Sequence, residues 1–227
     1  MPFPGEKKKW PKVIAFDTSG PFIKVAWATE SYSGGREVPM ARGQGEALFP
    51  FLEETLEQCG WSWREVDAIG VGVGPGNFTG VRIAVSAARG LGLALKIPVF
   101  GLTSFQIAAE HHVLPGDVIA TVKAPREMIY VAGPDLTPQL IDPSEPQAFA
   151  DTKAKRIVGH RAEEIAGALG LEGQDTEQHP EGGVERLADM TEFLYLEAMA
   201  FPAAPQPLYI KPADAAPPRD APPVLID

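Results

Sequence analysis

The sequence predicts an α/β fold built from two related subdomains, the second of which is shortened. Three observations support this prediction. Elements in the first half follow the order β-β-β-α-β-α-β-α, a glycine-rich turn joins a buried strand to a helix, and a poorer copy of the strand pattern follows Pro115 and Gly116. Three antiparallel strands followed by alternating helices and strands are typical of the ribonuclease H type of sheet, which actin-like (ASKHA) proteins contain twice. We place the first subdomain at residues 1–112 and the second, with a proline-rich tail, at residues 113–227.

The first three predicted strands carry a polar turn. An apolar run from Val13 to Phe16 ends in Asp17-Thr18-Ser19-Gly20, a second strand spans Phe22 to Thr29, and an edge strand is expected near Arg36 to Met40. Asp17, Thr18 and Ser19 offer a carboxylate and two hydroxyls, which could hold a hydrated cation or a phosphate. The same residue types are also common in ordinary turns, so both interpretations stay open.

Two long helices are predicted next. From Glu46 to Gln58, apolar residues recur on one side and glutamates on the other, which predicts an amphipathic helix whose regular hydrogen bonding Pro50 limits at the start. After a strand at Ala68 to Val73, the run from Thr79 to Leu95 is helical and rich in glycine, alanine and serine. Each glycine costs roughly 1 kcal/mol of helix propensity relative to alanine. We expect close packing against a neighbouring element to offset that cost.

The turn that precedes the second helix is Gly74-Pro75-Gly76. Its backbone N–H groups and the positive end of the helix dipole could face an anion such as a phosphate. A tight connection between strand and helix is the alternative. The loop has neither the Walker pattern nor the Rossmann GxGxxG pattern, so it does not by itself assign a nucleotide.

The remaining elements are shorter and more interrupted. Helices are predicted from Thr103 or Ser104, from Arg161 to Leu169 and from Val184 to Phe201, and strands at Val99 to Leu102, Val118 to Val122, Ile129 to Ala132 and Arg156 to Val158. The passage from Pro134 to Pro146 is proline-rich, and Leu171 to Gly183 is expected to be a polar loop. In the tail, Leu208-Tyr209-Ile210 is expected to dock as a short edge segment.

Composition narrows the class of protein. The chain of 227 residues is 44% hydrophobic, has one cysteine and carries 30 acidic against 20 basic residues, a net charge of −10. That charge opposes binding of a polyanion over the whole surface. No apolar run reaches the roughly 18 residues that span a bilayer, and no signal-peptide pattern is present, so we expect a soluble cytoplasmic protein.

Residues for catalysis are scarce. His111 and His112 are adjacent, so their side chains diverge on a helix, while His160 and His179 stand singly. No GxSxG, HExxH or CxxC pattern occurs. We therefore predict no catalytic residue and no metal site.

Four segments together resemble the TsaB (YeaZ) family, the bacterial subunit for biosynthesis of threonylcarbamoyladenosine in tRNA. They are Asp17-Thr18-Ser19, the helix from Gln44 to Leu56, the run Gly74-Pro-Gly-Asn-Phe-Thr-Gly-Val-Arg82, and Tyr209-Ile-Lys-Pro-Ala-Asp-Ala215. The resemblance covers nearly the whole chain and is densest from Val13 to Ala109. It implies two actin-like subdomains and a non-catalytic role in a complex with the catalytic paralogue TsaD and the ATPase TsaE.

The resemblance also implies that the metal centre of TsaD is missing here. In TsaD a His-x-x-x-His pair follows the strand that corresponds to Val99 to Leu102, and its histidines fall on Ser104 and Ala108 of this chain. Neither side chain can replace imidazole as a ligand. A second departure is Lys123-Ala124-Pro125, where the family usually has Asp-Ala-Arg.

In the family the first two helices contact TsaD, and the same surface can support a homodimer. Carried over, the helices are Gln44 to Gln58 and Thr79 to Leu95, and tRNA is met only through the complex. The predicted interface residues are Leu48, Phe51, Leu52, Thr55, Val81, Arg82, Val85, Ala88 and Arg89.

The residues and the resemblance suggest two interpretations of nucleotide binding. The chain is expected to have no cofactor of its own, with ATP or ADP bound only within the assembled complex. The residues that could touch a nucleotide or phosphate are Asp17, Thr18, Ser19, Gly74 and Gly76. An alternative is a stand-alone actin-like phosphotransferase that binds ATP through these residues, but the segment at Lys123 is not a recognisable second phosphate loop.

Overall fold

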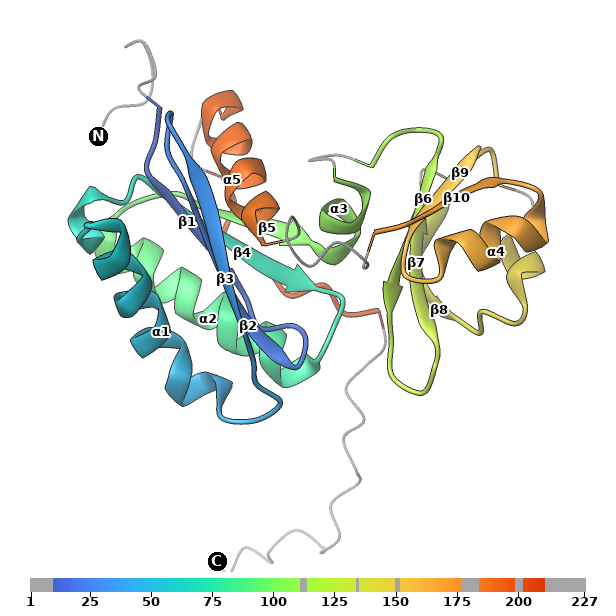
Figure 1. Cartoon of the computed structure of the whole chain (residues 1–227), viewed down its shortest axis with the longest axis horizontal. Helices are drawn as coiled ribbons and strands as arrows, with labels where there is room; N and C mark the ends of the chain where they lie inside the picture. Colours follow the sequence, from blue (N-terminus) through green and yellow to red (C-terminus); the bar gives the residue numbers. More distant parts are fainter. Residues whose placement is uncertain are drawn as a thin grey trace, which may run out of the picture.

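The computed structural model describes residues 10–110, 114–133, 135–149, 152–176, 184–198 and 202–210. These residues form two β-sheets, each five-stranded, in two lobes that lie side by side (Figure 1). The predicted histidine pair at 111–112, His179 and the residues beyond Ile210 lie outside the described residues.

The first sheet has the strand order β3-β2-β1-β4-β5. Strand β2 pairs antiparallel with both β1 and β3, while β4 is parallel to β1 and β5 is parallel to β4. Buried apolar runs form the two central strands, and the mostly half-exposed β3 lies at one edge as predicted. The bounds are β1 Val13–Asp17, β2 Phe22–Ala28, β3 Ser33–Pro39, β4 Ala68–Gly74 and β5 Val99–Thr103.

The second sheet repeats this arrangement with the order β8-β7-β6-β9-β10. Its first three strands are antiparallel, and β9 and β10 continue in parallel from β6. The same order and directions in both sheets confirm the duplicated actin-like, ribonuclease H-like fold. The bounds are β6 Val118–Lys123, β7 Ile129–Gly133, β8 Leu136–Ile141, β9 Arg156–Gly159 and β10 Glu172–Asp175.

Two of these strands were not predicted: β8 lies in the passage described only as proline-rich, and β10 in a segment that was wrongly predicted as a loop. Strand β8 lies within the proline-rich passage, and its edge position tolerates Pro138 because an edge strand leaves half of its N–H groups outside the ladder. Strand β10, with the sequence EGQD, lies in the expected polar loop at the other edge. Its ladder with β9, not an apolar pattern, makes it a strand.

The helices confirm the predicted order but pack across the lobes. Helices α1 (Gln44–Cys59) and α2 (Phe78–Leu95) cover one face of the first sheet, and α4 (Ala162–Leu169) packs against β9 and β10. Helix α3 (Ser104–Ala109) leaves the first sheet and packs on the second, whereas α5 (Glu185–Glu197) follows the second sheet in the chain and packs on the first (Figure 1).

Two short 3₁₀ helices complete the structure and show how the second lobe is shortened. The first, η1, spans Trp63–Glu65. The second, η2, spans Pro146–Phe149 and stands between β8 and β9, at the place in the order that α1 occupies in the first lobe. Below, the first lobe means the first sheet with α1, α2 and α5, and the second lobe means the second sheet with α3 and α4.

The exchange of α5 makes a testable prediction about the core of the first lobe. Leu187 on α5 is 1% exposed in a cluster with β1, β2 and β5, so Leu187→Ala should lower the free energy of unfolding by about 2–5 kcal/mol. Leu93→Ala, at an 82% exposed leucine, is the matched control and should change it by less than about 0.5 kcal/mol. Urea unfolding measures both, and equal effects would contradict the packing of α5 on the first sheet.

Candidate functional site

A cleft of about 680 Å³ lies between the two lobes. Its walls come from the tip of β1 and the Gly-Pro-Gly loop of the first lobe, and from α3 and the ends of β6 and β9 of the second. Polar and charged lining residues include Asp17, Ser19, Lys24, Gln44, Asn77, Ser104, Thr121, Lys123, His160 and Arg186. Three of the five predicted nucleotide or phosphate residues, Asp17, Ser19 and Gly76, therefore line one cleft. Thr18 is buried and Gly74 precedes the lining residue Pro75, so neither lines it.

Asp17 holds its own turn together. Its carboxylate accepts the Ser19 backbone N–H at 2.7 Å and the Ser19 hydroxyl at 2.9 Å, and the residue is only 5% exposed. Burial raises the pKa of Asp17 above its usual 3.8, against the lowering effect of the hydrogen bonds from Ser19 and the charge of Lys24. The carboxylate is thus committed to the local turn.

Gly76 and Gly80 let this turn press against the start of α2. A Cβ on Gly76 would lie 2.5 Å from the Ser19 carbonyl oxygen, and one on Gly80 would overlap the Thr18 carbonyl oxygen at 1.8 Å. The Asn77 N–H donates to the Ser19 carbonyl at 2.6 Å, and the Thr18 hydroxyl donates to the Gly80 carbonyl at 2.7 Å. The loop was interpreted either as a phosphate site or as a tight connection between strand and helix. This geometry favours the tight connection, because Thr18 and Ser19 occupy the space at the start of α2.

Gln44 is a site residue that the sequence did not single out. Its side-chain amide donates to the Gly20 and Phe22 carbonyls at 2.7 and 2.6 Å, so it joins the first residue of α1 to the β1–β2 turn. A glutamine at a helix start has no distinctive sequence pattern. Only its 8% exposure and its contacts reveal this role.

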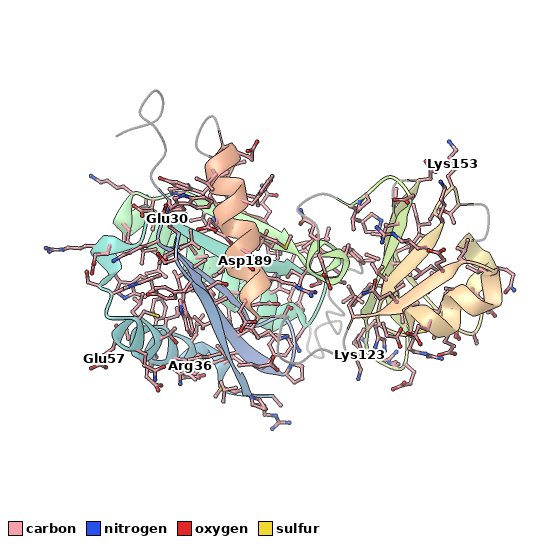
Figure 2. The ribbon with its side chains drawn as sticks, turned by 45° about the horizontal axis from the view of Figure 1, so that its top comes forward. Glu30, Arg36, Glu57, Lys123, Lys153 and Asp189 are labelled. Atoms are coloured by element: carbon pink, nitrogen blue, oxygen red, sulfur yellow. The ribbon has the colours of Figure 1, made fainter. Side chains whose placement is uncertain are left out.

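Ser104 and Ala108 both line the cleft on α3. The Ser104 hydroxyl donates to the Pro75 carbonyl at 2.9 Å, which ties α3 to the Gly-Pro-Gly loop. Lys123 belongs to the Lys-Ala-Pro segment that differs from the family's usual Asp-Ala-Arg. It is exposed at the end of β6 and points towards the gap between the lobes (Figure 2). Within the described ranges, no group of three or more His, Cys, Asp and Glu side chains is placed to share a metal ion.

A second hollow, a groove of about 410 Å³, runs between α1 and α2 on the outer face of the first lobe. Small and apolar residues line it: Gly45, Leu48, Phe49, Ile83, Ser86, Ala87, Gly90, Leu91 and Ala94. A Cβ on Gly90 would meet nothing within 4 Å, and Phe49 is 43% exposed. The groove therefore combines an open floor with apolar walls.

Most of the predicted interface residues are buried in the protomer, and of the nine only Leu48 also lines this groove. Six of them are at most 3% exposed in the core of the first lobe, namely Leu48, Leu52, Thr55, Val81, Val85 and Ala88. Phe51 is half-buried beneath the Arg36 guanidinium, which is 4.6 Å from its ring centre, and only Arg82 and Arg89 are exposed. The apolar stripe that the sequence analysis assigned to a partner faces the sheet, so the surface of the helix pair consists of other residues, chiefly Phe49, Ile83, Ser86, Gly90 and Leu93.

The family profile described as TsaD, tRNA N6-adenosine threonylcarbamoyltransferase, matches residues 38–178, which is more than half of the chain. The chain belongs to the TsaD family. Within that family several of its curated relatives carry the name TsaB, as the sequence predicted.

Three relatives named "tRNA threonylcarbamoyladenosine biosynthesis protein TsaB" illustrate the likeness. The protein of Buchnera aphidicola subsp. Acyrthosiphon pisum is 34% identical over 37% of this chain and 40% of its own length. That of Escherichia coli is 28% identical over 44% and 43%, and that of Haemophilus influenzae 30% identical over 52% and 51%. The chain thus spans about half or less of the curated relatives that it matches.

Solved structures extend the likeness in fold to most of this TsaD-family chain. YeaZ from Pseudomonas aeruginosa aligns with a TM-score of 0.64 and 24% identity, over 88% of this chain and 99% of its own. A second structure, of an uncharacterized protein with similarity to peptidase YeaZ from Pseudomonas aeruginosa, aligns with a TM-score of 0.67 and 22% identity, over 88% and 100%.

Helix α2 is the one described helix that is long and apolar enough to cross a membrane by length and composition. Buried helices of soluble proteins satisfy the same criteria. Here α2 packs against β4 and carries the exposed arginines 82 and 89.

The close approach at α2 predicts opposite effects for two glycines of the same helix. Gly80→Ala should lower the free energy of unfolding by about 1–3 kcal/mol or more, because the new methyl group overlaps a backbone oxygen that cannot move freely. Gly90→Ala meets open space and should raise it by up to about 1 kcal/mol through helix propensity. Thermal or urea unfolding compares them, and destabilisation by Gly90→Ala would contradict the assignment of its face.

The raised pKa of Asp17 predicts the sign of a pH effect. A carboxyl whose folded pKa lies above its unfolded value of 3.8 binds protons more tightly in the folded chain, so its stabilising contribution is present at low pH and is lost as pH rises through the folded pKa. Asp17→Asn keeps the shape but does not titrate. The stability of Asp17→Asn minus that of the wild type should therefore increase as pH rises from 3 towards 7, measured by urea unfolding, and a decrease would show that the pKa is lowered.

Proposed function

We propose that this chain is an accessory, non-catalytic subunit in the biosynthesis of threonylcarbamoyladenosine, the modified adenosine next to the anticodon of tRNA. It binds and activates TsaD, and it helps to recruit the ATPase TsaE. The TsaD family assignment and the relatives named TsaB support the pathway. The observation that carries the accessory role is the groove between α1 and α2.

The chemistry of the interlobe cleft supports a non-catalytic role. Ser104 and Ala108 occupy the positions where the resemblance places the histidines of TsaD, and neither can bind a transition metal through an imidazole nitrogen. Asp17 is bonded to its own turn, and the start of α2 is packed against Thr18 and Ser19. Because of these contacts, the loop offers no preformed phosphate-binding site of the kind that a stand-alone phosphotransferase needs. We therefore propose that ATP or ADP binds only in the assembled complex.

The groove suits a helix of another protein. Small residues on α2 let a second helix approach closely, as in helix pairs whose contact positions carry glycine, alanine and serine. Phe49 and Leu93 supply exposed apolar side chains beside it, at 43% and 82% exposure. Exposed aromatic and aliphatic side chains around a well-shaped hollow are the usual anchors of protein interfaces.

Charge on the two helices would orient the partner. Helix α1 presents exposed carboxylates at Glu46, Glu53 and Glu57, and α2 presents exposed guanidinium groups at Arg82 and Arg89. A partner with the opposite arrangement gains attraction at both sides in only one orientation. A second copy of this chain offers both signs as well, so we propose that the same face forms a homodimer when TsaD is absent.

The other partners follow from this role. The net charge of −10 disfavours direct binding of tRNA, so tRNA is met through the complex. The place of action is the cytoplasm, where the tRNA substrate and TsaD are made.

Reconstitution tests the proposal. TsaD from the same organism, TsaE, ATP, threonine, bicarbonate, the enzyme that makes threonylcarbamoyl-adenylate and unmodified tRNA are incubated with and without this chain. We expect modified adenosine only when TsaD and this chain are both present. Modification by this chain without TsaD, or full activity of TsaD without this chain, would refute the accessory role.

Gly90→Leu is the variant that tests the groove itself. The leucine enters open space in the isolated protein, so folding should be unaffected, but a docked helix should clash and binding to TsaD should weaken by about tenfold or more. Gly167→Leu is the matched control, because Gly167 is an exposed glycine inside α4 that also has open space around it. Calorimetric titration with TsaD measures both variants, and equal affinities would exclude the groove as the docking site.

A further inference from the structure

Residues 202–210 cross the junction between the lobes in an irregular, extended path. Pro205 is buried and lies against Gly101 of β5. The Leu208 N–H donates to the Val73 carbonyl near the end of β4 at 2.8 Å. This segment is therefore anchored on the first sheet, beside the strand that leads into the Gly-Pro-Gly loop.

The last three described residues contact both lobes in alternation. Leu208 and Ile210 pack against the buried cluster that α3 forms with the second sheet. Tyr209, between them, turns to the first lobe, where its ring centre lies 5.1 Å from that of Phe78 on α2. Successive side chains of an extended chain point to opposite sides, so this segment presents one face to each lobe.

Arg82 fastens Tyr209 to α2. Its Nε donates to the tyrosine Oη at 2.8 Å, and its guanidinium lies 3.8 Å from the centre of the Phe78 ring and 5.8 Å from that of Tyr209. One side chain thus makes a hydrogen bond and two cation–π contacts to the two aromatic residues. Tyr209 remains 44% exposed, so the contact is at the surface and can open without unfolding either lobe.

We propose that Leu208-Tyr209-Ile210 is an interlobe latch, closed by Arg82 and Tyr209, that sets the width of the cleft between the lobes. The other described contacts between the lobes involve α3. The Ser104 hydroxyl donates to the Pro75 carbonyl, Glu110 forms an ion pair with Arg186, and Ile107 packs against the buried cluster of the first lobe. The latch is a separate attachment, because it is made on α2.

The latch is tested on the isolated protein, without TsaD, so its failure does not depend on the proposed function. In a Cys59→Ser background, cysteines replace the exposed residues Glu30 of the first lobe and Lys153 of the second, which lie far apart in Figure 2. Spin labels on them, diluted with unlabelled protein, report the distribution of interlobe distances. Hydrogen exchange of the Leu208 amide reports opening of the segment.

We expect Tyr209→Ala and Arg82→Ala each to speed exchange of the Leu208 amide by about tenfold and to broaden the interlobe distance distribution. Tyr209→Phe keeps the ring and should have an intermediate effect. The double variant should resemble either single one, because both remove the same contact. Arg89→Ala, an exposed arginine on the same helix, is the control and should change neither reading.

Two results would overturn the latch. One is an unchanged exchange rate in Tyr209→Ala. The other is faster exchange with an unchanged distance distribution, which would mean that the segment rests on the lobes without holding them.

Discussion

The packing of the β1 tip against the first turn of α2 constrains the whole first lobe. Asn77 caps α2 with its side chain and donates its backbone N–H to Ser19, while the Thr18 hydroxyl reaches the Gly80 carbonyl. Gln44 joins α1 to the same turn. The β1–β2 turn therefore positions the starts of both helices, and their placement produces the groove between them.

The small residues of α2 serve two surfaces at once. Gly80, Ala84, Ala88 and Gly92 face inward, and a Cβ on Gly92 would lie 2.3 Å from the Val99 side chain. Ser86, Gly90 and Ala94 face the groove. The inward set allows the helix to lie close to the sheet, which offsets its loss of helix propensity. On the groove side, Gly90 loses helix propensity while a Cβ there would meet nothing within 4 Å, and this uncompensated cost is the physical argument for the proposed partner on that side.

The sequence predicts the central strands and long helices because buried elements carry their own apolar pattern. Strands β8 and β10 were missed since edge strands are made by pairing, and neither EGQD nor a passage with proline carries that information locally. Six of the predicted interface residues are buried in the protomer for a related reason. Periodicity identifies the apolar stripe of α1 and α2, but a stripe such as Leu48, Leu52 and Val85 packs first on the nearest sheet.

Long-range contacts set the remaining features. The exchange of α3 and α5 between lobes depends on which sheet face is left open by α1, α2 and α4, and no local pattern records this. The buried pairing of Asp17 with Ser19 likewise distinguishes a turn from a phosphate site only in three dimensions, because both use the same residue types.

The two lobes share a strand order but differ in their helices. Both sheets have the same strand order, yet the second lobe has η2 where the first has α1, so within the described residues only the first lobe presents a groove between two long helices. The exchanged helices α3 and α5 already bury one face of each sheet, so a change in the angle between the lobes need not expose either core. Such a change would alter only the contacts at the junction between the lobes. Arg82 lies there on the same helix as the groove, so the proposed docking surface and the proposed interlobe latch share α2.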